Sequence, residues 1–148
     1  MVKSRFAILL TCLLLSACGQ IDPNSPLGQR KAIFKQMLNT SEDLGGMLRG
    51  RIAFDAPRFS AGAAQLDQLS RQPWQHFPQI KDDAKSSAKD EVWQRQARFQ
   101  ELARQLESAT AALVVASTQQ PLNEAALDKP MQRVEDTCEA CHQEFRAF

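Results

Sequence analysis

Apolar residues recur three and four positions apart along nearly the whole chain from residue 27 onward, and this spacing constrains the fold more than any other feature. It places the apolar side chains on one face of an α-helix, and no segment shows a convincing strand alternation. Four such segments are separated by turn-rich connections. The chain of 148 residues is long enough for one domain with a real core. The sequence therefore predicts an all-α, antiparallel four-helix bundle.

The four helices are expected at about 27–51, from Asp55 to just before Pro73, at 88–117, and at 123–146, with a loop at 73–87. Gly45 and Gly46 weaken the first helix. They indicate either close approach of another helix or a flat ligand, or a flexible kink. Pro130 either kinks the last helix or follows a fresh start capped by Asp128.

The first 17 residues have the features of an export signal. A basic start is followed by an apolar run that is too short to span a bilayer comfortably. Its end, Leu15-Ser16-Ala17-Cys18, resembles a bacterial lipobox, in which cleavage precedes a lipid-bearing cysteine. The alternative is an ordinary signal peptide with Cys18 incidental. We expect a lipoprotein anchored at Cys18, with residues 18–26 as a tether, in the periplasm and more specifically at the outer membrane, because residue 19 is Gly and not Asp.

Charge argues against one class of function. Removing the signal, with Lys3 and Arg5, leaves 16 basic against 17 acidic side chains. This balance and the absence of a basic run exclude an electrostatic footprint for nucleic acid. Contact with a membrane is expected only through the lipid anchor.

The chain ends in CEACHQEFRAF, which contains Cys138, Cys141 and His142. On a helix these three side chains project from the same side. The two thiols can then add to the two vinyl groups of one haem, and the imidazole can bind its iron. Three other uses of two cysteines are less compatible with this sequence. A thioredoxin-like redox pair would need a βαβ setting, and a closed zinc site would need more ligands than the chain offers. A disulfide between Cys138 and Cys141 would cross-link almost nothing. The motif predicts one covalent haem c.

A second axial ligand could come only from upstream, because no Met or His follows His142. The candidates are Met37, Met47, Met131 and His76. Met131 shares a helix with His142 and cannot easily cross the ring. Met37 and Met47 lie among apolar neighbours, where methionine is more often part of the core, and His76 lies in a loop.

The chain resembles the cytochrome c′ family. The resemblance runs from about Leu27 to Arg146 and includes RKAIFKQM (30–37), GRIAFDA (50–56), PWQHF (73–77), Val92-Trp93 and the terminal CEACHQEFR. It implies a five-coordinate, high-spin haem with His142 as the proximal ligand. It also implies that Phe34 stands over the open iron face, where low-spin relatives have a methionine ligand. A shift of register would bring Met37 there instead.

Two arginines complete the expected site. Arg30 interrupts an apolar stripe, so a buried partner is expected, and a haem propionate is the natural one. Arg146 lies one turn beyond His142 and is expected to cover the proximal face, where the resemblance also places an arginine. For each, the alternative is a surface arginine that packs its aliphatic part on the protein.

These features predict a haem protein that binds nitric oxide reversibly under an apolar Phe34 cover, with carbon monoxide bound more weakly. No acid, base or nucleophile suggests an enzyme. The resemblance implies homodimers through the first two helices, and no redox partner is indicated. The alternative function is electron transfer by a six-coordinate, low-spin haem that uses Met37 or Met47.

Overall fold

The computed structural model describes residues 21–81 and 85–147. The predicted signal (residues 1–17), the lipidation site Cys18 and the start of the tether lie outside the described residues. The elements, in chain order, are α2 (Pro26–Leu48), α3 (Ala56–Ser70), the 3-10 turn η2 (Pro73–His76), α4 (Glu91–Gln94), α5 (Gln96–Ser117), the 3-10 turn η3 (Glu124–Ala126) and α6 (Asp128–Phe145).

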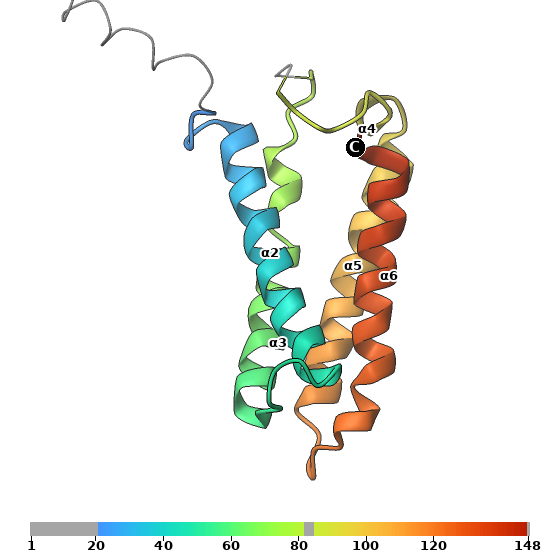
Figure 1. Ribbon diagram of the computed structural model, residues 1–148. Helices are drawn as coiled ribbons and strands as arrows, with labels where there is room; N and C mark the ends of the chain where they lie inside the picture. Colours follow the sequence, from blue (N-terminus) through green and yellow to red (C-terminus); the bar gives the residue numbers. More distant parts are fainter. Residues whose placement is uncertain (1–20, 82–84, 148) are drawn as a thin grey trace, which may run out of the picture.

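The long helices form an antiparallel four-helix bundle, as predicted (Figure 1). α2 packs on α3, α3 on α5, and α5 on α6. In Figure 1 the pair α2 and α3 lies apart from the pair α5 and α6 over the upper half, and the two pairs converge towards the lower end. Within residues 21–81 and 85–147 there is no strand, only one isolated bridge between Ala88 and Arg146. No helix in these residues is long and apolar enough to cross a bilayer.

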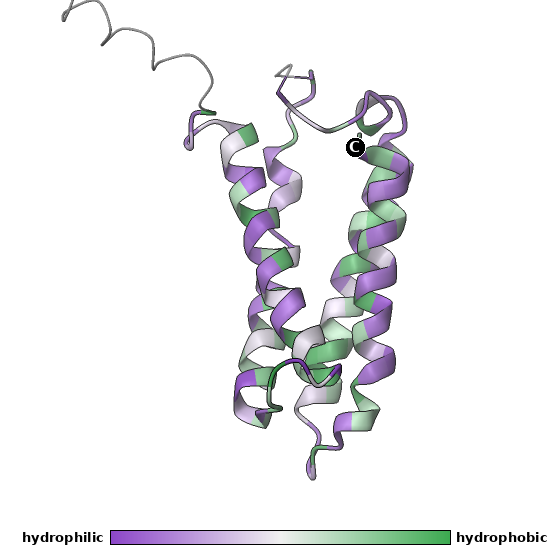
Figure 2. Cartoon of the chain, viewed as in Figure 1, coloured by the Kyte–Doolittle hydropathy of each residue, from purple (hydrophilic) through white to green (hydrophobic). Residues whose placement is uncertain are grey.

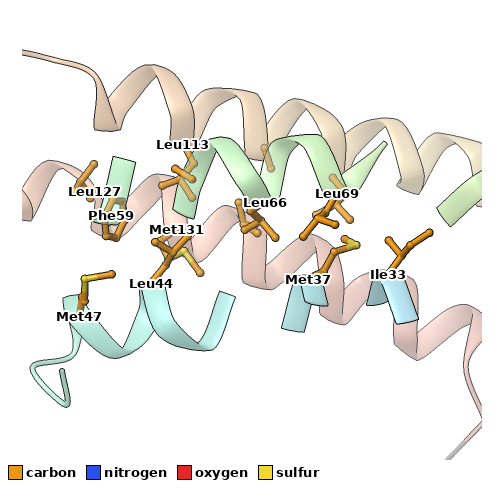
Figure 3. Close-up of a cluster of buried hydrophobic side chains, with 14 residues drawn as sticks. Ile33, Met37, Leu44, Met47, Phe59, Leu66, Leu69, Leu113, Leu127 and Met131 are labelled. Atoms are coloured by element: carbon orange, nitrogen blue, oxygen red, sulfur yellow. The ribbon is translucent and has the colours of Figure 1, made fainter. Parts of the chain in front are cut away.

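The predicted stripes form the core. Hydrophobic and hydrophilic stretches alternate along each long helix in Figure 2, and the buried hydrophobic residues form the core. Figure 3 shows the central cluster, which side chains from all four long helices build. Its fully buried members include Leu44, Phe59, Leu66, Leu113 and Val134. A second cluster around Val92, Phe99, Leu102 and Phe145 continues the core towards the other end of α6.

The first helix ends at Leu48, not at Arg51 as predicted. The amide of Arg49 still donates to the Gly45 carbonyl, at 3.0 Å. Gly50 then takes a positive φ of 70°, a conformation that glycine adopts without steric cost and that ends helices.

Gly45 and Gly46 do not kink α2, which runs continuously through both. A Cβ at Gly45 would meet the guanidinium of Arg49 and lie 2.9 Å from Oε1 of Glu135. These two side chains form an ion pair of 2.9 Å between α2 and α6. A Cβ at Gly46 would lie 2.9 Å from Cδ1 of Ile52. The glycines therefore make room for neighbouring side chains, including one on another helix.

The prediction of one helix over 88–117 is wrong at its start. The amide of Lys89 donates to the Phe145 carbonyl (2.9 Å), and the amide of Ala147 donates to the Ser87 carbonyl (2.8 Å). These extended contacts are incompatible with a helix there. A further break falls at Arg95 (φ −122°, ψ 49°), between α4 and α5. There the Arg95 side chain pairs with Glu144 of α6.

The fourth helix begins at Asp128, not at Asn123. Residues 124–126 form a separate 3-10 turn, for which the Asn123 side chain accepts a bond from the Ala125 amide (3.1 Å). Pro130 is the third residue of α6, where an amide has no partner within the helix. A fresh start near Asp128 is therefore correct, although Asp128 is the first helical residue and not the cap.

Candidate functional site

A cavity of about 850 Å³ lies between α2 on one side and α5 and α6 on the other. Its walls are mainly apolar; they include Leu27, Leu66, Val92, Leu102, Leu106, Val134 and Phe145. All six predicted site residues within the described chain also line it: Arg30, Phe34, Cys138, Cys141, His142 and Arg146. The structure therefore brings together residues from opposite ends of the sequence.

Cys138 and Cys141 lie one helical turn apart on α6, and both are half-buried. They are not joined in a disulfide. Burial is the main cause that raises the pKa of each thiol to about 11, with smaller contributions from the other cysteine and Glu135 at Cys138, and from Glu144 at Cys141. Both sulfurs are thus uncharged at neutral pH and suited to an apolar cavity, as the sulfur of a thioether would be.

The half-buried imidazole of His142 lies beside them. Burial, and secondarily the charge of Arg146, lowers the pKa of His142 below its ordinary value. The neutral imidazole, which is the form that binds metals, is therefore favoured near pH 7.

Arg30 is 2% exposed. Its Nη1 donates to the His76 carbonyl (2.9 Å) and its Nη2 to the Ser86 hydroxyl (3.0 Å). The guanidinium also lies over the Phe77 ring, 4.7 Å from its centroid. The predicted need for a buried partner is therefore met by protein groups from the segment after α3.

Arg146 is exposed and lies at the rim of the cavity, directly after α6. Its amide donates to the His142 carbonyl at 3.0 Å. The bridge to Ala88, with the bonds of Ser87 and Lys89 to residues on either side of Arg146, holds this end of the chain. The segment that carries His142 is thereby fixed at its C-terminal end.

Phe34 projects into the cavity from α2 and is backed by two aromatic side chains. Its ring centroid lies 6.0 Å from that of Trp74 and 6.4 Å from that of Phe77, both in edge-on arrangements. Trp74 and Phe77 each pack against Phe99 of α5, at 5.8 and 4.9 Å. The wall around Phe34 is thus a continuous aromatic cluster.

Most of the candidates for a second axial ligand lie away from the cavity. Met37 lines the cavity, but it is 5% exposed, and Figure 3 shows its side chain among Leu66 and Leu69 in the core. Met47, Met131 and His76 do not belong to the residues that line the cavity. Met47 and Met131 are buried in the core instead.

The donor set and the cavity fit a covalently attached haem. Two uncharged thiols one turn apart, a neutral imidazole and a buried guanidinium face one large apolar space. Trp74, Ser86 and Phe99 also line this space, and sequence reasoning did not assign them to the site. Of these three residues, only Trp74 lies in a stretch that the sequence analysis singled out, PWQHF (73–77), which is part of the family resemblance.

The comparisons with known proteins agree with this arrangement. A family model described as Cytochrome C′ matches residues 25–146. A cytochrome c′ of Rhodopseudomonas palustris is 28% identical over 147 residues, covering 99% of this chain and 98% of that protein. The structure of cytochrome c′ from Shewanella frigidimarina aligns with a TM-score of 0.80 and 25% identity, covering 88% of this chain and 100% of that one.

Two variants of cytochrome c′ from Alcaligenes xylosoxidans have the same fold. One is a carbon monoxide complex and the other a nitric oxide complex. Each aligns with a TM-score of 0.77 and 21% identity over 88% of this chain, covering 100% and 99% of the respective structures.

Proposed function

The chain belongs to the cytochrome c′ family, whose members carry one covalently bound c-type haem, and we propose that this protein binds nitric oxide reversibly at that haem, as a buffer or sink for the gas. Carbon monoxide is the weaker ligand. The protein acts as a binder and not as an enzyme.

Cys138 and Cys141 would form the two thioethers, and His142 would be the proximal ligand. When bound, the haem supplies an iron whose second face accepts a small neutral ligand. Arg30, at the cavity wall, would pair with a propionate, and Arg146, at the rim, would cover the proximal side; both residues line the cavity. The chain's own contribution is to hold these groups around a dry space and to restrict what enters it.

The observation that carries the proposal is the position of Phe34 on α2, across the cavity from the helix that bears Cys138 and His142. A phenyl ring cannot ligate iron and offers no hydrogen bond to bound dioxygen. A gas must displace the ring, which disfavours weak ligands. The solved nitric oxide and carbon monoxide complexes of the Alcaligenes relative support gas binding as the use of this fold.

Electron transfer through a six-coordinate haem is the second candidate, and Met37 is the observation that favours it. Of the candidate ligands considered, Met37 alone lines the cavity. Met37 lies on α2, as Phe34 does, but its side chain is packed in the hydrophobic core.

Absorption spectra of the ferric and reduced holoprotein, with and without nitric oxide, test the proposal. We expect a high-spin ferrous spectrum that changes on addition of the gas. We also expect F34A to bind carbon monoxide faster than the parent protein, while L38A, altered at the exposed rim of the same cavity, does not. A low-spin spectrum with a methionine–iron band, unmoved by nitric oxide and abolished in M37L, would establish the electron carrier instead.

A further inference from the structure

Trp74 backs the Phe34 ring and is itself held from outside the cavity. Its indole Nε1 donates to Oε1 of Glu107, on α5, at 2.9 Å. Glu107 is half-buried and does not belong to the cavity lining. Its second carboxylate oxygen lies 3.8 Å from Nη1 of Arg71. The Glu107 carboxylate therefore contacts the cavity wall through the indole ring of Trp74, which lines it.

The backbone that carries Trp74 is fixed independently of Glu107. Trp74 lies in the 3-10 turn η2, at whose end the His76 carbonyl accepts a bond from Arg30 of α2. Phe77 follows directly and is held between the Arg30 guanidinium and Phe99. Loss of the Glu107 bond would consequently release the indole without displacing the turn.

The orientation of the indole determines how far Phe34 can move. The two rings meet edge-on, with an interplanar angle of 68°. A Phe34 ring that yields to an entering gas must move against its neighbours, and Trp74 is one of the two aromatic rings that back it. Hydrogen bonds to a charged acceptor are stronger than neutral ones, so the carboxylate of Glu107 holds the indole firmly.

We propose that Glu107 is a positioning residue for gas entry: by fixing the Trp74 indole behind Phe34, it sets the rate at which a diatomic ligand reaches the haem cavity. This role rests on the proposed function, since it requires Phe34 to cover an open iron face. By holding the Trp74 indole in place, Glu107 increases the steric barrier that the Phe34 ring presents to small neutral ligands.

Stopped-flow measurement of carbon monoxide association with the ferrous holoprotein tests this role. E107M keeps a side chain of similar length but removes the acceptor, and we expect association about threefold to tenfold faster, the factor that loss of such a hydrogen bond allows. E107Q retains an amide oxygen as a neutral, weaker acceptor, so its association rate should lie between those of the parent and E107M.

A double-mutant cycle separates positioning from general loosening. In the F34A background, E107M should leave the rate unchanged within about twofold, because the ring through which it acts is absent. Equal acceleration in both backgrounds would overturn the proposal, as would an E107M rate equal to that of the parent protein.

W74F removes the same bond from the donor side and should accelerate association even if E107M fails to fold. W93F is the matched control. The Trp93 indole donates to the Pro78 carbonyl (2.6 Å), but Trp93 is not part of the cavity lining. Ultraviolet resonance Raman bands of the indole should report loss of the N–H hydrogen bond to residue 107 in E107M, and only a weaker bond in E107Q, whose acceptor is neutral. Unchanged bands in E107M would contradict the assignment.

Different results would contradict the proposed gas-binding function and the role of Glu107. If the iron is six-coordinate, the parent spectrum is low-spin and F34A does not accelerate association, so the proposed function fails. If the iron is open and F34A is fast while E107M and W74F match the parent, only the role of Glu107 is wrong.

Discussion

The buried guanidinium of Arg30 shows how one side chain serves both the fold and the site. It joins α2 to the segment after α3 by bonds to the His76 carbonyl and the Ser86 hydroxyl. It also lines the cavity proposed to hold the haem. Because a buried charge is costly without partners, these contacts stabilise the cavity wall.

Glu144 is the residue for which a pH effect on stability is expected. Hydrogen bonding from Arg98, reinforced by the charges of Arg98 and Arg95, lowers its pKa below the ordinary value for a glutamate. The unfolded chain therefore binds a proton more readily than the folded one. The stabilisation is present above the ordinary glutamate pKa and is lost as pH falls through the lowered folded value.

E144Q should consequently lower the melting temperature near pH 7 and reduce its decline between pH 7 and pH 3. Thermal unfolding of the holoprotein, followed by circular dichroism across this range, measures both effects. E139Q is the control on the same helix, since Glu139 accepts a bond from the neutral Gln143 and not from an arginine. Identical acid profiles for E144Q and the parent would contradict the assignment.

At the level of the elements, the end of α6 determines the path of the preceding segment. Residues 87–89 pair with residues 145–147 and so cannot join the helix that follows. Arg95, at the break between α4 and α5, pairs with Glu144 and lies over the Phe145 ring, 5.7 Å from its centroid. The same contacts fix the end of the helix that carries His142.

P130A tests the position of Pro130 in α6. A proline inside a helix costs roughly 3 kcal/mol, so its removal from a kink would stabilise the protein by several kcal/mol. Pro130 lies in the first turn, and we expect a change of less than about 1 kcal/mol, arising mainly from greater freedom of the unfolded chain. P57A, in the first turn of α3, is the matched control. Chemical denaturation of the holoprotein measures the change in the free energy of unfolding for both variants. A large stabilisation by P130A alone would show that Pro130 kinks α6.

At the level of the whole molecule, we propose that the bundle is exported, tethered to the periplasmic face of the outer membrane through a lipid on Cys18, and paired with a second copy through α2 and α3. The lipobox-like sequence before Cys18 and the polar stretch up to residue 26 support the anchor. The family resemblance supports the dimer.

C18S should abolish incorporation of labelled fatty acid and move the holoprotein from the membrane fraction to the soluble fraction. Sedimentation of this soluble variant should give twice the mass of one chain. Fatty acid labelling that persists in C18S would exclude the lipid anchor at this residue, and a monomeric mass would exclude the dimer.

The sequence by itself determined the elements that depend on local pattern. The 3-4 spacing of apolar residues predicted helices with one buried face. The apolar residues of α3 and α5 that follow this spacing are buried: Phe59, Ala63, Leu66 and Leu69 in α3, and Phe99, Leu102, Leu106, Ala109 and Leu113 in α5. The spacing of Cys138, Cys141 and His142 predicted one shared helical face. Both follow from the fixed 3.6-residue period of the helix, which a chain displays without knowledge of its neighbours.

Only the tertiary structure decided the features that depend on contacts between distant residues. Residues 87–89 pair with residues 145–147, and Arg95, at the break between α4 and α5, pairs with Glu144. The late start of the third helix and its break thus coincide with contacts between distant residues, which helix propensity does not encode. Trp74 and Glu107 lie 33 positions apart, and their contact exists only once η2 packs against α5. The aromatic wall behind Phe34 therefore became visible only in three dimensions, since its members share no period along the sequence.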